Sequence, residues 1–363
     1  MKLLRLATTL NPTSAPYNQF SLGFRSSIVQ TYCSLFQNDL SIEHDIKVFH
    51  GDGSILKMIR ILRKLISSQH YDVIHIHSGV MGVILFLAIF PLRISILKKT
   101  IFTLHNSWNI IKTRNQILNL IVMLGVKKIC TCGKSSQASI PKIINFFIGS
   151  KINSVVNGFD HLRIDDVEKN KIGTGHFIKD SSLKILCVGA LNNTKNQSAL
   201  IEVLKEIKIN AEVIFLGDGI NKKTLIKAAK EIDPCTKIIF KGRISRNLTI
   251  EHMLEADVSI SLSKGEGLPI AVLESMYAGC FQILSIIPPH KEIAPPSSRC
   301  IFVDASKNED IASSLHFVEK NIEVIRAEKE SSRIYTMNSF NLDNMLKEYM
   351  KVYLSLLNPS DSS

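Results

Sequence analysis

The sequence predicts an α/β protein with two tandem, Rossmann-like doubly wound domains and a ligand cleft between them. The chain has 363 residues, which is enough for two domains of ordinary size. Short apolar runs alternate with amphipathic stretches, a pattern typical of a parallel sheet covered by helices on both faces. The alternation stops at a polar, charged stretch over residues 160–182, which we interpret as a linker, and then restarts.

In the first half, the apolar runs predict strands over residues 3–9, 47–50, 73–76, 100–104, 128–131 and 152–156. The amphipathic stretches between them predict helices over residues 20–36, 55–67, 80–90, 113–124 and 135–145. The most hydrophobic run, residues 79–92, is shorter than the ~20 residues that span a bilayer. We interpret it as a buried helix, and a helix dipping into a membrane surface is the alternative.

The second half repeats the pattern. Strands are predicted over residues 184–188, 212–216, 237–240, 258–261, 282–285 and 300–303. Helices are predicted over residues 197–207, 222–232, 247–254, 270–278, 310–320 and 341–357. We therefore place a first domain at residues 1–165 and a second domain at residues 182–335. Residues 336–363 are expected to form a helix that crosses back to the first domain.

Composition narrows the class of protein. The seven cysteines are odd in number and include no CxxC pair, which favours a reduced, cytosolic protein over a disulfide framework or zinc site. Residues 1–165 hold 19 lysines and arginines against 7 aspartates and glutamates, a difference of +12 that equals the whole net charge. Such a basic half suggests an anionic partner, although a generic solvated surface is the alternative. Nucleic acid is disfavoured, because the basic residues are not interleaved with aromatic ones.

The most informative segment is residues 263–279, SKGEGLPIAVLESMYAG. A glycine-containing loop follows a predicted strand and leads into a helix that Pro269 is expected to begin. Free backbone N–H groups and the positive helix end would converge there, which suits a diphosphate. Glu266 and Glu274 carry negative charge, so their expected partners are hydroxyl groups of a sugar and a ribose. Two ordinary solvated glutamates are the alternative.

This segment resembles the E-x7-E signature of the family-four retaining glycosyltransferases, whose two-domain architecture is called GT-B. Glu266 and Glu274 match the two glutamates, and Gly267, Leu268 and Pro269 match the loop between them. In that family the first glutamate contacts the donor sugar and the second contacts the nucleotide ribose. The resemblance implies that Glu266 is catalytic and that Gly267, Leu268 and Glu274 bind the donor.

A second segment is similar to the family's strand, glycine turn and phosphate-binding lysine. Gly189 matches the turn and Lys195 matches the lysine. Ala190 stands where the family has an arginine, so a strong phosphate contact is missing. Lys264 and Arg243 are the candidate substitutes.

Two glycine loops support the same resemblance. Residues 215–219 resemble the family's glycine pair at a strand end. Gly242 and Arg243 resemble the loop that lies against the donor base, so both are predicted to bind the donor.

The first domain offers a histidine site. His75 and His77 share one face of a strand, so a metal is conceivable, but no third ligand is apparent and we interpret them as buried structural residues. His105 and Asn106 resemble the family's Thr-x-His-Asp, in which the histidine lies at the donor sugar. His105 is therefore the second catalytic candidate. The loop over residues 11–22 is expected near the donor phosphates.

The resemblance implies an enzyme, a retaining hexosyltransferase that uses a nucleotide-diphosphate sugar. UDP-sugars are the favoured donors and GDP-sugars the alternative. No Asp-x-Asp pair ends a strand, so neither a metal nor another cofactor is expected. The basic half suggests a lipid-linked saccharide acceptor and a peripheral position on the cytoplasmic, anionic face of the cell membrane. Synthesis of a bacterial surface polysaccharide, such as O-antigen of lipopolysaccharide or capsule, fits this setting.

Two other functions stay open at the level of sequence. One is a nucleotide-sugar epimerase of similar architecture, which would need no acceptor. The other is a non-catalytic sugar-nucleotide-binding protein, suggested by Ala190.

Overall fold

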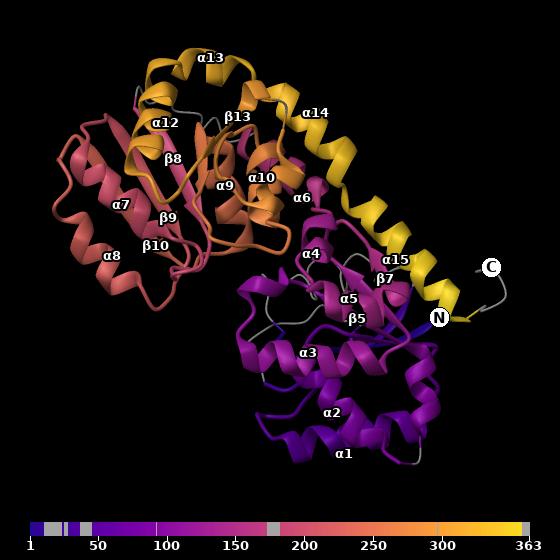
Figure 1. Cartoon of the computed structure of the whole chain (residues 1–363). Coiled ribbons are helices and arrows are strands. Elements are labelled where there is room, and N and C mark those ends of the chain that lie inside the picture. Colours follow the sequence, from indigo (N-terminus) through magenta and orange to yellow (C-terminus); the bar gives the residue numbers. More distant parts are fainter. Residues whose placement is uncertain are drawn as a thin grey trace. The chain divides into compact units, whose positions relative to one another are not determined.

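The chain forms two compact units, and each is described by itself (Figure 1). Unit 1 comprises Met1–Gly158 and Leu342–Ser363, and unit 2 comprises Phe159–Asn341. The computed structural model describes residues 1–10, 24, 28–36, 46–91, 93–172, 182–295 and 297–357. The loop expected near the donor phosphates, residues 11–22, lies entirely outside this part of the chain.

Unit 1 is built on a seven-stranded parallel sheet with the order β3-β2-β1-β4-β5-β6-β7. Its strands are β1 (Lys2–Ala7), β2 (Val29–Ser34), β3 (Lys47–His50), β4 (Val73–Ile76), β5 (Thr100–Leu104), β6 (Lys128–Thr131) and β7 (Ile152–Ser154). The order reverses between β1 and β4, and such a switch point leaves a crevice at the carboxyl ends of the strands.

Helices cover both faces of this sheet. They are α1 (Ile55–Ser68), α2 (Gly79–Ile89), α3 (Thr113–Gly125), α4 (Lys134–Ala138), α5 (Lys142–Ile148) and α15 (Leu342–Leu357). Because side chains alternate along a strand, Leu4 packs on the face of α1 and α2, whereas Leu3 packs with Tyr349 and Tyr353 of α15. The last helix of the chain therefore completes the core of the first unit (Figure 1).

The predicted helix over residues 20–36 is wrong for residues 28–36, the longest part of this segment that the structure describes. Residues 29–34 form β2, which pairs in parallel with β1 and β3. Tyr32 and Cys33 are both buried, so the segment has apolar groups on both faces, as a central strand requires. Pairing with β1 overrides the helix-like spacing of the apolar residues.

Another predicted helix, over residues 135–145, is divided in two. The first part, α4, ends at Ala138, and α5 begins at Lys142 after Pro141. Proline has no N–H to donate and restricts the residue before it, so one continuous helix cannot pass this point.

Unit 2 repeats the doubly wound plan with a six-stranded parallel sheet in the order β10-β9-β8-β11-β12-β13. Its strands are β8 (Leu183–Val188), β9 (Ala211–Leu216), β10 (Thr236–Gly242), β11 (Val258–Ser261), β12 (Phe281–Ser285) and β13 (Cys300–Val303). Here the order reverses between β8 and β11. The loops that follow these two strands are the two segments with the strongest motifs in the sequence.

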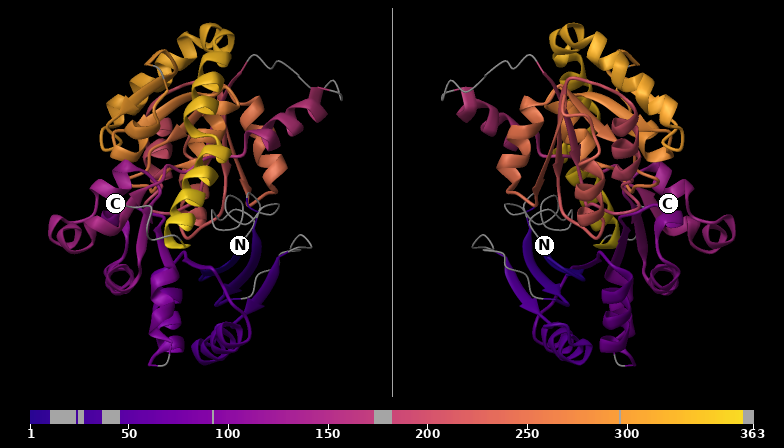
Figure 2. Two further views of the ribbon diagram at one scale, coloured as in Figure 1. Left: turned by 90° about the vertical axis from the view of Figure 1, so that its right-hand side faces the viewer. Right: turned by 90° about the vertical axis from the view of Figure 1, so that its left-hand side faces the viewer.

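The helices of unit 2 surround this sheet (Figure 2). They are α6 (His161–Ile172), α7 (Gln197–Glu206), α8 (Lys222–Ala229), α9 (Arg246–Glu255), α10 (Ile270–Tyr277), α11 (Pro288–Ile293), α12 (Asn308–Lys320), α13 (Ile322–Ala327) and α14 (Lys329–Phe340). None of the helices in the described ranges is both long and apolar enough to cross a bilayer.

The prediction of a linker over residues 160–182 is wrong for its first part, because α6 occupies residues 161–172. Ile164 and Val167 are buried one helical turn apart, and α6 packs against α9. Asp165 accepts hydrogen bonds from Tyr277 and Arg333. These tertiary contacts stabilise a helix that is too polar to be recognised from its sequence.

Candidate active site

Three glycine-containing loops lie side by side at the carboxyl ends of β8, β9 and β10. Gly189 N–H donates to Leu216 O over 2.9 Å, and Gly217 N–H donates to Gly242 O over 2.8 Å. A Cβ atom on Gly217 would lie 2.0 Å from Gly189 O, and φ of Gly217 is +139°. Only glycine allows this close approach of two backbones.

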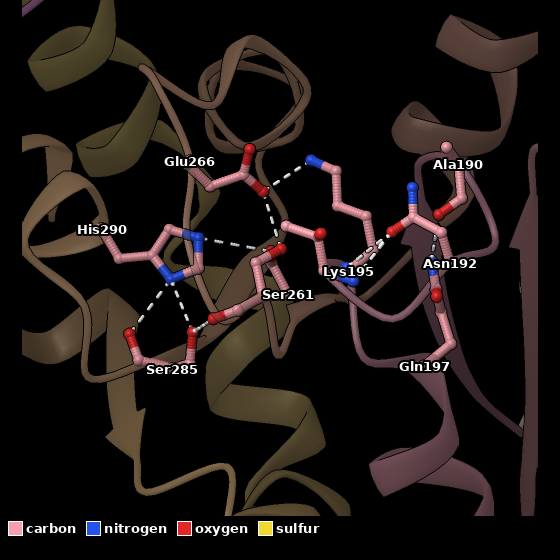
Figure 3. A network of polar contacts seen from close by, with 10 residues as sticks. Ala190, Asn192, Lys195, Gln197, Ser261, Glu266, Ser285 and His290 are labelled. Carbon is pink, nitrogen blue, oxygen red and sulfur yellow. Dashed lines mark hydrogen bonds and ion pairs between the residues drawn. The ribbon is translucent and has the colours of Figure 1, made fainter. Parts of the chain in front are cut away.

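The loop after β8 presents Lys195 at the switch point of the sheet (Figure 3). Asn192 shapes this loop, because its Oδ1 accepts hydrogen bonds from the N–H groups of Thr194 and Lys195, both over 3.0 Å. The ammonium of Lys195 lies 2.5 Å from Oε1 of Glu266, in the loop after β11. The structure therefore brings together the two residues that the sequence assigned to diphosphate and sugar.

Glu266 is held by a polar network that extends to a buried histidine (Figure 3). Ser263 Oγ donates to Glu266 Oε1 over 2.7 Å and lies 3.3 Å from Ser261 Oγ. Ser261 Oγ is in turn 3.3 Å from His290 Nε2. The other ring nitrogen of His290 lies 3.0 Å from the carbonyl oxygen of Ser285. This network fixes the position of the carboxylate from the strand side.

His290, on α11, is fully buried. Burial lowers its pKa to about 4, against the attraction of Glu266, which acts to raise it. At neutral pH the imidazole is uncharged, so it orients the serines by hydrogen bonding. No sequence motif indicated His290, because α11 is a short helix that was not predicted.

Glu274 lies on α10 and is 3% exposed. Its Oε1 contacts the guanidinium of Arg246, the first residue of α9. Its Oε2 is buried without a hydrogen-bond partner among the described residues. Burial and the like charge of Arg163 lower the pKa of Arg246 to about 10, so it stays cationic at neutral pH. A buried carboxylate oxygen with free acceptor capacity is suited to a ligand hydroxyl.

The candidate substitutes for the missing arginine at Ala190 are surface residues. The side chains of Lys264 and Arg243 are exposed, as Ala190 itself is. Arg246, which sequence reasoning missed, is instead the partly buried arginine beside Glu274. In the sequence, Arg246 is marked only as the first residue of a helix that the side chain of Ser245 caps. That position alone does not indicate a ligand site.

The loop between the two glutamates differs in detail from expectation. The helix α10 starts at Ile270, the first residue of the predicted range, and Pro269 is its N-cap rather than its first helical residue. Positive φ angles occur at Gly189, Gly217 and Gly242 but not at Gly267. Gly267 and Leu268 are buried beside Glu266. Gly267 therefore does not provide a left-handed turn in this loop.

Unit 1 has a buried polar cluster at its own switch point. Arg5 on β1 is fully buried and donates to Gln30 over 2.7 Å. One of its guanidinium nitrogens lies 3.1 Å from His75 Nδ1, which is 2.7 Å from the hydroxyl of Tyr353 on α15. Burial, with the charge of Arg5 adding to it, holds the pKa of His75 well below its usual range. His75 is thus a structural residue, neutral and hydrogen-bonded.

His105 follows β5 at the edge of this cluster. Its Nε2 lies 3.0 Å from Nδ1 of His77, and burial lowers the pKa of His105 to about 4. The two histidines line a pocket of about 150 Å³ together with residues of α2 and α3. Asn115, on α3, lines it too, and its Oδ1 is buried without a partner among the described residues. The pocket therefore offers neutral hydrogen-bonding groups to a polar ligand.

The described residues contain no cluster of three or more histidines, cysteines, aspartates or glutamates that could hold a metal ion. In both units, buried acceptor atoms without a partner among the described residues suit the hydroxyl groups of a ligand, namely Asn115 Oδ1 in unit 1 and Glu274 Oε2 in unit 2. In unit 2, cations lie beside the two carboxylates of the site, Lys195 next to Glu266 and Arg246 next to Glu274.

Known proteins resemble the chain in sequence and in fold. Residues 168–334, most of unit 2, match the family model for glycosyl transferases group 1. The capsular polysaccharide biosynthesis glycosyltransferase CapH of Staphylococcus aureus is 24% identical over 323 residues, which cover 86% of this chain and 82% of CapH. HepE of Anabaena, solved in complex with UDP-glucose, superposes with a TM-score of 0.80 at 15% identity, covering 98% of this chain and 100% of HepE.

A shorter match connects the chain with an enzyme named for a lipid-linked acceptor. It is the N-acetylgalactosamine-N,N'-diacetylbacillosaminyl-diphospho-undecaprenol 4-alpha-N-acetylgalactosaminyltransferase of Campylobacter jejuni, 28% identical over 106 residues, or 28% of each chain. The fold likeness to HepE and the two doubly wound sheets confirm the predicted GT-B architecture.

Proposed function

We propose that the chain moves a sugar from a nucleotide-diphosphate sugar to a saccharide acceptor with retention of anomeric configuration. The match of unit 2 to the glycosyl transferases group 1 model, the relative CapH and the GT-B fold support this proposal. The bond between the anomeric carbon and the diphosphate oxygen breaks, and the acceptor hydroxyl oxygen bonds to that carbon. The nucleoside diphosphate leaves, and the hydroxyl proton passes to the departing phosphate oxygen. The Lys195–Glu266 pair at the switch point of unit 2 is the observation that best supports this reaction.

Each residue of the donor site has a role suited to its charge. Lys195 neutralises the charge that develops on the leaving diphosphate. Glu266 binds hydroxyls of the donor sugar, and Glu274 binds the ribose through its free Oε2. Backbone groups and side chains at the carboxyl ends of the strands complete the donor-binding surface, namely Gly189, Gly242, Arg243, Gly267 and Leu268.

We assign the donor to unit 2 and the acceptor to unit 1, where His105 is the second catalytic residue. Its neutral imidazole can accept or donate a hydrogen bond at a sugar hydroxyl without adding charge. Asn115 in the same pocket has a free acceptor for a further hydroxyl. Catalysis rests on alignment of the acceptor and stabilisation of the leaving group.

The names of the relatives support a particular setting. CapH is named for capsular polysaccharide biosynthesis, and the Campylobacter enzyme for a diphospho-undecaprenol acceptor. HepE binds UDP-glucose in its crystal structure, which favours UDP-sugars over GDP-sugars as donors. We therefore propose a lipid-linked saccharide acceptor, surface polysaccharide synthesis, and a peripheral position on the cytoplasmic, anionic face of the membrane.

A panel of UDP- and GDP-sugars, incubated with and without a bacterial lipid extract, tests the proposal. We expect release of nucleoside diphosphate only when lipid acceptor is present, with the sugar recovered in the lipid fraction. Isomerisation of the donor without acceptor would favour an epimerase instead. Donor binding without turnover in any combination would favour a non-catalytic binding protein.

A further inference from the structure

A long stretch of unit 1 carries positive charge without any negative charge. Residues 73–159 contain ten lysines and arginines and no aspartate or glutamate. This stretch supplies β4 to β7 and helices α2 to α5. A protein surface built from it attracts anions and has no acidic side chains of its own to weaken the field.

Four of these lysines, Lys98, Lys127, Lys128 and Lys151, line one pocket of about 450 Å³. Lys128 begins β6 and Lys151 directly precedes β7, so the pocket lies at the amino ends of the strands. Burial lowers the pKa of Lys151, and the like charge of Lys127 lowers it further. The cations thus repel one another, and an anion placed between them would relieve this repulsion.

Helices α3 and α5 contact each other in unit 1 (Figure 1). Together they expose an unusual amount of apolar surface. Phe146 is 84% exposed and Phe147 is 64% exposed. Six large apolar side chains of the two helices are exposed, namely Ile117, Ile121, Leu124, Ile143, Phe146 and Phe147. Such a concentration is more than the scattered apolar residues of an ordinary surface.

The apolar side chains and the lysine pocket adjoin each other. The ammonium of Lys151 donates a hydrogen bond to the carbonyl oxygen of Leu124 over 2.7 Å, and Gly125, the next residue, lines the pocket. Lys142, the first residue of α5, is exposed and adds a further cation. We call this region the α3–α5 surface.

We propose that the α3–α5 surface docks unit 1 on a bilayer rich in anionic phospholipid. The two phenylalanines insert at the boundary between headgroups and acyl chains, while the lysine pocket receives lipid phosphate. Apolar insertion flanked by lysines is the combination by which peripheral proteins bind such membranes. The inference rests on the proposed function in one respect, since a lipid-linked acceptor would lie in that membrane.

The α3–α5 surface is separate from the candidate catalytic residue of unit 1. The lysines lie at the amino ends of β6 and β7, whereas His105 follows the carboxyl end of β5. Substitutions on the α3–α5 surface should therefore change membrane binding and leave donor binding unaltered.

Sedimentation of the full chain with vesicles tests the proposal without any turnover. We expect binding to phosphatidylglycerol-containing vesicles, weaker binding to pure phosphatidylcholine, and release by salt. The double variant Phe146→Ser/Phe147→Ser should lower the binding constant about tenfold or more. Lys127→Gln should lower it about fivefold, as expected for one lysine near an anionic surface.

Two substitutions in unit 2 serve as matched controls. Ile220→Ser removes an apolar side chain as exposed as Phe146, and Lys223→Gln removes an exposed lysine. Neither should change vesicle binding. Equal losses from the control and surface variants, or no loss from the Phe146/Phe147 pair, would overturn the proposal.

Fluorescence gives a second measurement that does not depend on loss of binding. The chain has a single tryptophan, Trp108, which is buried. Phe146→Trp should show a blue shift with anionic vesicles and quenching by brominated acyl chains, while Ile220→Trp should show neither. No shift at position 146 would contradict insertion. Sugar transfer to a detergent-solubilised acceptor would still proceed in that case, so this failure is distinguishable from failure of the proposed function.

Discussion

Replacing Lys195 with alanine tests the donor site most informatively, because the substitution has two separate effects. The ammonium lies 2.5 Å from Glu266 Oε1, with the lysine side chain 28% exposed and the glutamate more buried. Such a partly buried pair should contribute about 1–2 kcal/mol, between the values for exposed and buried pairs. In a unit of this size that loss lowers the midpoint of thermal unfolding by about 2–8 °C.

The effect on catalysis should be larger. Lys195→Ala removes one charge-assisted hydrogen bond to the diphosphate, worth about 1.5–3 kcal/mol, so kcat/KM should fall about 10- to 150-fold. Lys195→Arg keeps the cation and should recover part of the activity. Lys237→Ala is the matched control, since Lys237 pairs with Glu212 over 2.7 Å near the amino ends of β10 and β9, away from the loops at the carboxyl ends.

Steady-state kinetics with a nucleotide sugar and acceptor, together with thermal unfolding of each variant, separate the two effects. We expect the control to keep full activity and to lose at most about 1 kcal/mol. A kcat/KM of Lys195→Ala within a factor of about three of the wild type would be too small for a lost phosphate contact and would refute the assignment.

Two further predictions concern stability. His290 has a folded pKa of about 4. Because the unfolded chain protonates this imidazole below its ordinary pKa, the contribution of His290 to the free energy of unfolding should fall by about 1.4 kcal/mol per pH unit as pH drops from 6.5 towards 4. Urea titrations of wild type and His290→Asn across this range should differ by that slope, and parallel curves would contradict a neutral buried histidine. Gly217→Ala places a Cβ atom 2.0 Å from Gly189 O and should cost more than about 2 kcal/mol, whereas Gly149→Ala, with ordinary contacts and no positive φ, should cost little. Equal stability of the two alanine variants, measured by thermal unfolding, would show that the loops can separate.

Local patterns predicted much of the fold. The strands at residues 258–261 and 300–303 have the predicted bounds, because short apolar runs between polar residues leave little choice of structure. The segment over residues 29–34 was predicted wrongly, because its spacing of Tyr32 and other buried residues also suits a helix. Only pairing with β1 decides in favour of a strand.

The sequence predicted those residues of the candidate site that belong to recognisable motifs, and it missed the others. Lys195 and Glu266 belong to loops with recognisable motifs, and the reversal of strand order places these loops together. Arg246 and His290 enter the same region from helices without a motif, so only the tertiary fold brings them there. The spacing of residues along the sequence predicts single helices and strands. It does not predict contacts between residues of different elements, such as those of Arg246 and His290.

The central claim is that Glu266 takes part in acceptor-dependent sugar transfer from a nucleotide sugar. The most direct measurement compares turnover by Glu266→Ala with turnover by Glu309→Ala, an exposed glutamate of the same unit. We predict that Glu266→Ala binds to acceptor-containing vesicles normally but loses about 100-fold or more of kcat, while Glu309→Ala keeps wild-type kcat. Unchanged turnover by a folded Glu266→Ala variant would contradict the account.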